Sequence, residues 1–418
     1  MDEDSLVLSA RASTGIQELD HILEGGFPRN GIYTLFGESG AGKTTAGLLF
    51  LLEGAQRGER SVYISFLQSR QDLEATARSH GWNLKGIQIE DPASLAQTKR
   101  ITAEQTIFHT IHVELVEIMT AIHKVVERTI PHRLVLDAIS DLRLLTDSSF
   151  RYKRQLIALK RFLEGRQTTV ILLCGHAPES DTELQSMVDG VIVLEQRMPV
   201  YGRVRRCLHV KKLRASSYLC GYHEFRITRG EVRVYPRLGS DRTVVPSTTR
   251  VMKTDIEELD SMLGGGLETG SACLITGPSG AGKSSLAALY AYSAARRGEP
   301  AAIFLFDENL HTYTKRAKGL GMDMQPLVQA GLIQLHLYSI GQITPAEFTY
   351  SIRRVVEEDK ASVVVIDCLT GYYTTMVEER FVLESLHELL AYTGSHSVLT
   401  LLTLAQYGLL GEGAPTRV

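Results

Sequence analysis

Residues 14–45 read TGIQELDHILEGGFPRNGIYTLFGESGAGKTT, and residues 254–285 read TDIEELDSMLGGGLETGSACLITGPSGAGKSS. At a constant offset of 240, these two stretches are identical at 14 of 32 positions. The offset still holds where GWNL at 81–84 meets GMDM at 321–324. A repeat of this length indicates two whole domains rather than the short stacked units of a solenoid.

The two copies are joined by a stretch that lacks helical periodicity. It reads PRLGSDRTVVPSTTR at 236–250 and is rich in Pro, Ser, Thr and Arg, as linkers are. We therefore place a first domain at residues 10–240 and a second at 247–418. The second copy is expected to be truncated at its C-terminal end, because it stops soon after an apolar run at 398–404. The last strand and a basic hairpin of the first copy have no counterpart there.

Short apolar runs alternate with helical stretches in each copy. In the first copy these runs predict strands at 32–36, 62–66, 134–137, 169–174 and 191–194. Because the runs are apolar throughout and separated by helices, they predict a mostly parallel sheet with helices on both faces. The expected fold class is α/β, with two tandem domains of this kind.

The composition is that of an ordinary globular protein and excludes several classes. With 418 residues, 44% of them hydrophobic and 22% charged, the chain is neither wholly disordered nor collagen-like. No apolar run reaches the ~18 residues of a membrane helix. The 45 Lys and Arg against 48 Asp and Glu give a net charge of −3, which disfavours a nucleic-acid coat. The acidic start MDEDSLVLSA and five isolated cysteines indicate an untargeted cytoplasmic protein with reduced thiols.

Two glycine-rich loops have the pattern of a phosphate site. GESGAGKT at 37–44 and GPSGAGKS at 277–284 both fit G-x-x-x-x-G-K-[ST], and each follows an apolar strand and opens a helical run. Glycine lets successive backbone N–H groups curl around phosphates without a Cβ in the way. Lys43 and Lys283 are predicted to neutralise the β- and γ-phosphates. The other expected nucleotide contacts are Gly37, Ser39, Gly40, Ala41, Gly42, Thr44, Thr45, Gly277, Ser279, Gly280, Ala281, Gly282, Ser284 and Ser285.

Four oxygen-bearing residues are candidate ligands of Mg²⁺. Thr44 and Ser284 follow the two lysines and supply hydroxyls, while Asp137 and Asp367 end apolar strands downstream of each loop. The alternatives are a glycine-rich turn without a ligand and an aspartate that only caps a turn. The paired placement favours a magnesium nucleotide, and the nucleotide expected is ATP.

The two copies differ where a residue is needed to orient the attacking water. After its second strand the second copy reads IFLFDEN, which puts Asp307 and Glu308 at the carboxyl end of a strand. Open α/β sheets build their sites at that edge. The first copy has Leu67 and Gln68 at these positions; leucine accepts no proton and glutamine orients water only weakly. We expect hydrolysis mainly in the second domain, the alternative being that the two acids only start the next helix.

These features together resemble the KaiC family of tandem RecA-like ATPases, whose namesake is a circadian clock protein. The resemblance covers nearly the whole chain. It rests on the T-G-I-x-x-L-D…G-G pattern, both P-loops, ARSHGWNL at 77–84, KLR at 212–214 and the hairpin YHEFRITRGEVRVYP at 222–236. It implies two RecA-like domains and a double-layered hexamer with ATP at the subunit boundaries.

The resemblance also implies roles for individual residues. In that family two adjacent glutamates activate water in each domain, and Asp307 and Glu308 match that pair. The KLR element of the family reaches the nucleotide of the neighbouring subunit, which implies trans-acting roles for Lys212 and Arg214. Further nucleotide contacts are implied for Leu213, Ser79, Ser216, Tyr218 and Thr228. The autophosphorylated Ser-Thr pair of the clock protein would lie beyond Val418, so kinase activity is not carried over.

Two other patterns have competing interpretations. The basic stretch RVRRCLHVKKLR at 203–214 is typical of a DNA-binding strand or of a charged edge strand, besides holding the KLR element. It lacks the interleaved aromatic residues that stack on bases. His109 and His112 have helical spacing, but zinc needs three or four ligands, so a role on the helix surface or in the core is favoured for them. A packing role is favoured for Trp82.

The residues and the resemblance together predict a ring-forming ATPase with Mg·ATP at two sites. A signalling or clock-related role with regulatory protein partners is expected, and neither nucleic acid nor a membrane is an expected partner. A recombinase-type DNA-dependent ATPase and a non-catalytic, nucleotide-gated scaffold are the alternatives.

Overall fold

The computed structural model of the chain contains two compact units. It describes residues 11–66, 68–91, 107–140, 143, 148–175, 181–198, 203–238, 250–339, 341–376 and 382–405, without the side chains of 107–114. The unit with the first P-loop extends to Arg237, and the unit with the second P-loop begins at Leu238. The domain limits expected at 240 and 247 fall outside the described residues.

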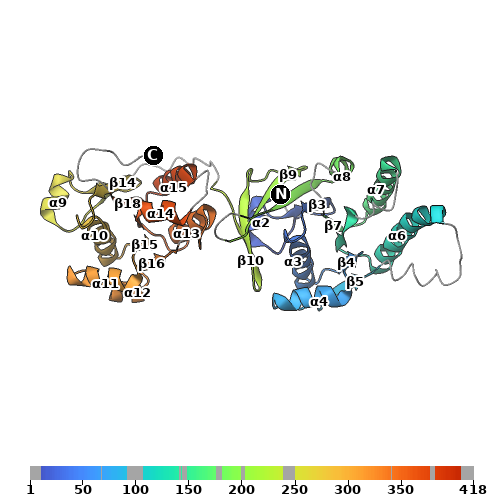
Figure 1. Ribbon diagram of the computed structural model, residues 1–418, viewed down its shortest axis with the longest axis horizontal. Helices are drawn as coiled ribbons and strands as arrows, with labels where there is room; N and C mark the ends of the chain where they lie inside the picture. Colours follow the sequence, from blue (N-terminus) through green and yellow to red (C-terminus); the bar gives the residue numbers. More distant parts are fainter. Residues whose placement is uncertain are drawn as a thin grey trace, which may run out of the picture. The chain divides into compact units, whose positions relative to one another are not determined.

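A nine-stranded sheet forms the centre of the first unit (Figure 1), in the order β11-β10-β9-β8-β3-β7-β6-β4-β5. In this spatial order, the six strands from β8 through to β5 are parallel to one another. Beyond β8, the strands β9, β10 and β11 each pair antiparallel with the strand before them. The predicted mostly parallel sheet and its five strands are confirmed. The bounds are β3 (Ile32–Gly37), β4 (Ser61–Ser65), β5 (Ile87–Glu90), β6 (Arg133–Asp137), β7 (Thr169–Cys174), β8 (Gly190–Arg197), β9 (Arg205–Leu213), β10 (His223–Thr228) and β11 (Glu231–Tyr235).

Helices cover both faces of this sheet because its central strands are apolar on both sides. Every residue of β3 and β7 is buried. One core cluster packs α2 (Gln17–Ile22), α3 (Lys43–Gln56) and α4 (Arg70–Ser79) against one face. A second cluster packs α6 (Ile107–Thr129), α7 (Ser149–Leu163) and α8 (Thr182–Met187) against the other. A separate two-stranded ladder joins β1 (Arg11–Ala12) to β2 (Phe27–Pro28).

The second unit repeats this arrangement with a smaller sheet. Its parallel order is β14-β18-β17-β15-β16, formed by β14 (Ala272–Gly277), β15 (Ala301–Leu305), β16 (Ile333–Leu337), β17 (Val363–Asp367) and β18 (Leu399–Ala405). One cluster contains α10 (Lys283–Arg296), α11 (Leu310–Gly319) and α12 (Gln325–Gln329), and the other contains α13 (Pro345–Glu357), α14 (Leu369–Thr375) and α15 (Val382–Ser395). The remaining elements are β12 (Val251–Met252), α9 (Glu257–Met262) and β13 (Leu267–Glu268).

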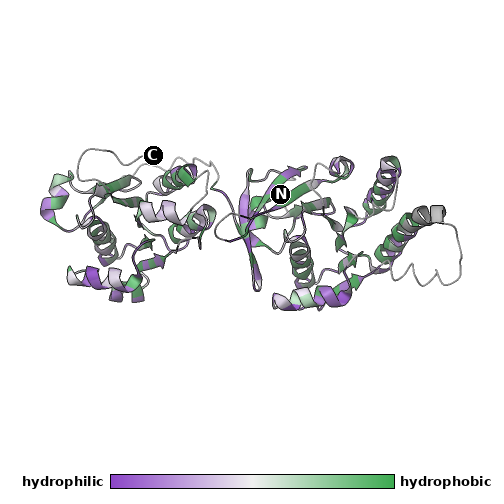
Figure 2. Cartoon of the chain, in the orientation of Figure 1, coloured by the Kyte–Doolittle hydropathy of each residue, from purple (hydrophilic) through white to green (hydrophobic). Residues whose placement is uncertain are grey.

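Hydropathy follows these layers. Figure 2 shows α10 and the strands of the second sheet largely in the colours of apolar residues, whereas α11 is largely hydrophilic. The β-branched run Val363–Ile366 is fully buried, with 0% exposure at each residue. Within the described residues, no helix combines the length and apolar character needed to cross a membrane.

The first strands of the two sheets differ in exposure. In the first unit β3 lies between β7 and β8 and is wholly buried. In the second unit β14 pairs with β18 alone among the described residues, and its residues alternate between exposed and half-buried up to Gly277. Leu274 is 46% exposed. No described element of the second unit corresponds to β8, so one edge of β14 is open among the described residues.

The basic stretch at 203–214 does not form an edge strand. It forms β9, which pairs with β8 on one side and β10 on the other. The interpretation as a charged edge strand is therefore wrong; the edge position is taken by β11, the second strand of the predicted hairpin. The composition of a strand does not reveal how many neighbours it has.

Candidate functional site

Each P-loop connects the end of a buried strand to the start of a helix. Gly42 precedes α3 with a φ of 102°, and Gly282 precedes α10 with a φ of 87°. This left-handed backbone is readily available only to glycine. The helices begin at Lys43 and Lys283, and their first N–H groups have no partner within the helix. Such a helix start is suited to bind phosphate.

The two lysines occupy equivalent positions. The Lys43 ammonium donates to the carbonyls of Gly37 at 2.7 Å and Glu38 at 2.8 Å. Lys283 donates to the first two carbonyls of its own loop at 2.9 and 2.7 Å. Burial lowers the pKa of Lys43, while the charge of Asp137 opposes that shift. Each ammonium thus lies against the backbone of its own loop, within reach of a phosphate bound by that loop.

The predicted magnesium ligands meet in pairs. The Thr44 hydroxyl donates to Asp137 at 3.3 Å, and the Ser284 hydroxyl donates to Asp367 at 3.0 Å. Asp137 ends β6 and Asp367 ends β17, so parallel strands bring each carboxylate to its loop. An all-oxygen set that leaves room for phosphate and water suits Mg²⁺. The residues present therefore fit a magnesium nucleotide in both units.

Two further hydroxyls contact these aspartates and were not expected. Tyr63 on β4 donates to Asp137, and Thr403 on β18 donates to Asp367 at 2.5 Å. Burial and the neighbouring Asp137 raise the pKa of Tyr63, so it remains a donor. Burial also raises the pKa of Asp367, and the Thr403 and Ser284 hydroxyls oppose this shift. The sequence signal was weak, since each hydroxyl lies in a strand that also holds other hydroxyl residues, Ser61 and Ser65 on β4 and Thr400 on β18.

A cleft surrounds the first P-loop. Its lining combines the loop with residues of other elements, namely Ser39, Gly40, Gly42, Lys43, Thr44, Thr45, Ser65, Gln68, His80, Asp137, Ala138, Gly175, Arg206 and Ile227. The hairpin of β10 and β11 contributes Ile227, and β9 contributes Arg206, whose Nε donates to the Gly40 carbonyl at 3.3 Å. The His80 ring lies 3.3 Å from the Thr228 carbonyl. Thr228 therefore lies near the P-loop of its own chain.

The KLR element lies at the opposite end of the sheet. Leu213 is in register with Gly190 at the start of β8, whereas Gly37 of the P-loop is in register with Leu194. The Lys212 ammonium donates to the carbonyls of Gln185 at 2.8 Å and Val188 at 2.6 Å. Lys212 thus does not reach the P-loop of its own chain.

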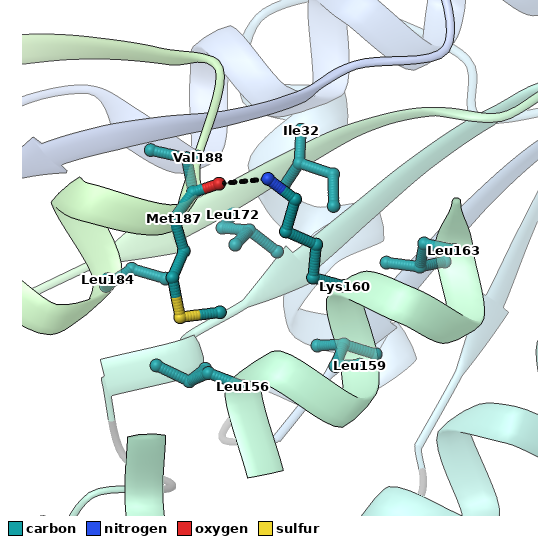
Figure 3. Close-up of a pocket in the computed structure, with 9 residues that line it drawn as sticks. All are labelled: Ile32, Leu156, Leu159, Lys160, Leu163, Leu172, Leu184, Met187 and Val188. Atoms are coloured by element: carbon teal, nitrogen blue, oxygen red, sulfur yellow. Dashed lines mark hydrogen bonds between the residues drawn. The ribbon is translucent and has the colours of Figure 1, made fainter. Parts of the chain in front are cut away.

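The carbonyls at the end of α8 bind several cations. Figure 3 shows a small apolar cavity between α7 and α8, at whose rim the Lys160 ammonium donates to the Met187 carbonyl at 2.7 Å. Arg214 donates to the Ser186 carbonyl at 3.0 Å and lies 3.7 Å from Asp189. Together with Lys212, these side chains satisfy helix-end carbonyls that have no partner within the helix.

The other implied nucleotide contacts are dispersed. Ser216 accepts a hydrogen bond from Arg11 at 2.9 Å, and Tyr218 packs against the first core cluster. The Ser79 hydroxyl donates to the Thr76 carbonyl within one turn of α4, at 2.7 Å. One chain does not bring these residues together with Thr228 around one nucleotide.

The acidic pair of the second unit lies just beyond β15. Asp307 accepts a hydrogen bond from the Cys368 thiol at 2.7 Å, and burial raises the pKa of that thiol to about 11. Glu308 forms an ion pair with Arg316 at 2.6 Å. In the first unit Gln68 lines the cleft around the P-loop, and Leu67 lies outside the described residues. The described site therefore has a carboxylate in the second unit where the first has an amide.

His109 and His112 fall on α6, but their side chains lie outside the described residues. Among the residues whose side chains are described, no three His, Cys, Asp or Glu gather into a metal-binding cluster.

Trp82 stacks on His80 with ring centroids 4.7 Å apart, and its indole N–H donates to the Gly230 carbonyl at 3.1 Å. Trp82 thus connects α4 to the hairpin.

Comparison with known proteins identifies the family. The family model described as "ATPase: KaiC" matches residues 12–239 and 252–409, one match in each unit. The chain belongs to the KaiC ATPase family. The expected resemblance and the two tandem RecA-like domains are thereby confirmed.

Several KaiC proteins are similar over most of the chain. The circadian clock oscillator protein KaiC of Picosynechococcus sp. is 25% identical over 363 residues, which cover 86% of this chain and 70% of that protein. The circadian clock protein KaiC2 of Synechocystis sp. is 26% identical over 382 residues, 90% of this chain and 66% of that one. KaiC of Synechococcus elongatus is 26% identical over 331 residues, 78% and 63% respectively. The chain thus spans about two thirds of the length of these relatives.

Proposed function

We propose that this KaiC-family protein binds Mg·ATP at both P-loops and hydrolyses it slowly, mainly at the second. Membership of an ATPase family supports ATP as the substrate class. The observation that supports unequal hydrolysis at the two sites is the carboxylate of Glu308, which is replaced by the amide of Gln68 in the first unit. A positioned base contributes about 10²–10⁴-fold in rate. The first site therefore serves mainly to hold nucleotide.

Each residue of the second site has a distinct task in this proposal. Lys283 balances phosphate charge, and the backbone N–H groups at the start of α10 bind phosphate oxygens. Ser284 and Asp367 would hold Mg²⁺, which when bound polarises the phosphoryl oxygens. Glu308 orients the attacking water and accepts its proton. Asp307 accepts a hydrogen bond from the Cys368 thiol at 2.7 Å and does not fully replace Glu308 as the base.

The test is ATP hydrolysis by the wild type and variants of each site. Glu308→Gln should remove most of the activity, because it deletes the base and keeps the shape. Gln68→Glu should add a small rate at the first site, and Lys283→Ala should abolish binding at the second. A normal rate in Glu308→Gln together with complete loss in Lys43→Ala would invert the assignment of the two sites.

We further propose a ring in which nucleotide lies between subunits, with a signalling or clock-related role. The position of Lys212, at the sheet end remote from its own P-loop, supports a trans-acting role, and the names of the relatives support clock-related signalling. The alternatives are separable in the same assay. Stimulation of hydrolysis by single-stranded DNA would favour a recombinase-type ATPase, and no turnover at all would favour a scaffold.

A further inference from the structure

Arg316 on α11 forms the closest described contact of the Glu308 carboxylate. One guanidinium nitrogen lies 2.6 Å from Oε2 of Glu308, and Nε lies 3.4 Å from Oε1. Both side chains are about one third exposed, at 33% for Arg316 and 28% for Glu308. One oxygen is thus held firmly by a charge-assisted hydrogen bond, while the other keeps acceptor capacity for a water molecule.

Arg316 is itself fixed by a residue of α10 and by a residue of its own helix. Its remaining terminal nitrogen donates to the Ser285 hydroxyl at 3.0 Å, and Ser285 is the third residue of α10, directly after the candidate magnesium ligand Ser284. The guanidinium carbon lies 5.0 Å from the centroid of the Tyr313 ring, which is fully buried. The pKa of Arg316 is raised: burial alone would lower it, but Glu308 more than offsets this effect.

This geometry differs from that of an ordinary surface ion pair. Exposed Arg–Glu pairs contribute little because both side chains are free to move. Here the fork of the guanidinium bridges the carboxylate after β15 and the first turn of α10. Because a planar guanidinium that is hydrogen-bonded at two ends cannot rotate freely, it fixes both the distance and the orientation of its carboxylate partner. The carboxylate is therefore held at a defined place relative to the P-loop.

The first copy of the repeat lacks this arrangement. At the offset of 240, Arg316 corresponds to Thr76 and Glu308 to Gln68. The Tyr313 position holds Leu73. The cation and the carboxylate occur together in the second unit and are both replaced in the first, as expected if one serves the other.

We propose that Arg316 is the positioning residue that holds Glu308 against the second P-loop for water activation. This inference rests on the proposed role of Glu308 in hydrolysis and adds a residue to it. Arg316 touches neither phosphate nor water in this role; it acts through Oε2 of Glu308 and leaves Oε1 to accept the proton. Its loss should lower the turnover rate and leave ATP affinity nearly unchanged.

The experiment measures single-turnover hydrolysis in the otherwise unchanged chain, where the proposed function assigns turnover mainly to the second site. Fluorescent-ATP binding is measured in a Lys43→Ala background, in which only the second site binds. Arg316→Ala should lower the hydrolysis rate by about 10- to 100-fold, the cost of a misplaced catalytic group, with binding changed less than about 3-fold. Arg316→Lys should recover part of the rate, because it keeps the charge but not the fork. Arg354→Ala is the matched control, since it removes an exposed pair between Arg354 on α13 and Glu358 directly after it, and it should hydrolyse normally. Thermal melting checks that each variant is folded.

A double variant separates this inference from the proposed function. If Arg316 acts through Glu308, adding Arg316→Ala to Glu308→Gln should cause no further loss, since coupled residues are not additive. Further loss of similar size, a loss of binding rather than rate, or faster hydrolysis by Arg316→Ala would each overturn the positioning role while leaving Glu308 as the base. A normal rate in Glu308→Gln would overturn the proposed function and the inference with it.

Discussion

At the scale of single residues, the two units hold their strand-end aspartates with different hydroxyls. Tyr63 on β4 contacts Asp137, and Thr403 on β18 contacts Asp367. At the equivalent positions of the other copy stand Ile303, at the offset of 240, and Leu173, at the offset of 230 that aligns Asp137 with Asp367. Each hydroxyl orients a carboxylate that would otherwise rotate, and such outer partners contribute strongly to metal affinity.

Tyr63→Phe should therefore weaken Mg·ATP binding at the first site. We expect about a 10-fold loss of affinity, the lower end of the effect of removing a hydrogen bond to a ligand. Binding of a fluorescent ATP analogue in a Lys283→Ala background measures this site alone. Tyr33→Phe is the control, because Tyr33 is equally buried but its hydroxyl donates to the Pro28 carbonyl, at 2.6 Å. Equal losses in the two variants would argue for a packing effect.

The predictable part of each site is the part that is contiguous in sequence. The P-loop residues and Asp137 and Asp367 could be identified because the motif and the strand end define them locally. Tyr63 and Arg316 could not, because their contacts depend on which strands and helices become neighbours. The internal repeat still marks such residues, since a polar side chain in one copy opposite an apolar or short one in the other signals a copy-specific contact.

At the scale of elements, a charge cluster joins the strand ends opposite the P-loop in the first unit. The guanidinium of Arg133, at the start of β6, is 1% exposed and pairs with Glu59, which also pairs with Arg29 at 2.6 Å. Burial by itself raises the pKa of Glu59, but hydrogen bonds from Arg133 and Arg29 more than offset it, so the pKa is lowered. Burial lowers the pKa of Arg133, yet a guanidinium stays charged near neutrality. The carboxylate therefore governs the pH dependence.

Glu59→Gln should destabilise the protein by about 3 kcal/mol near neutral pH, because it leaves a buried guanidinium without its counter-charge. The folded-state pKa of Glu59 lies below its ordinary value of 4.5. The stabilisation is thus present above that value and is lost as pH falls through the folded-state pKa. Urea unfolding across pH checks this, with Glu53→Gln, whose partner Arg57 is 53% exposed, as a nearly neutral control. A difference that persists in acid would exclude the ion pair as its cause.

The elements that could be predicted are those with continuous apolar runs. All five strands expected in the first copy form, because their residues are buried on both faces. The edge strands β5 and β16 were missed, since each is short and carries exposed or half-buried polar residues such as Gln88 and Gln334. The neighbours of β9 were equally beyond prediction, because pairing depends on the whole sheet.

At the scale of the whole molecule, the P-loop and the KLR element occupy opposite ends of one sheet. The register that places Gly37 beside Leu194 places Leu213 beside Gly190. Four residues of β8 separate the two positions, about 13 Å at ~3.3 Å per residue, and the Lys212 ammonium is bonded to carbonyls at the end of α8 rather than turned to the P-loop. A ring that joins the two ends through neighbouring copies satisfies both sets of contacts.

Lys212→Ala should accordingly weaken assembly in Mg·ATP, as measured by light scattering. The control is Lys211→Ala, which removes the neighbouring exposed lysine at the irregularity between β8 and β9. Lys43→Ala should also reduce assembly, because it empties the first site, whereas Lys283→Ala should spare it. A wild type that stays monomeric in saturating Mg·ATP, or normal assembly by Lys212→Ala, would contradict a ring held together by ATP at the first sites.

The open edge of β14 has a consequence for the behaviour of the protein in solution. Its backbone N–H and C=O groups have no partner strand among the described residues on that side, and Leu274 presents apolar surface beside them. In dilute solution, water forms hydrogen bonds with these backbone groups. Another extended chain can form the same hydrogen bonds and also bury the side chain of Leu274. Where that edge is left uncovered, pairing with a further extended segment is expected at β14 rather than at β3, whose corresponding edge is covered by β8.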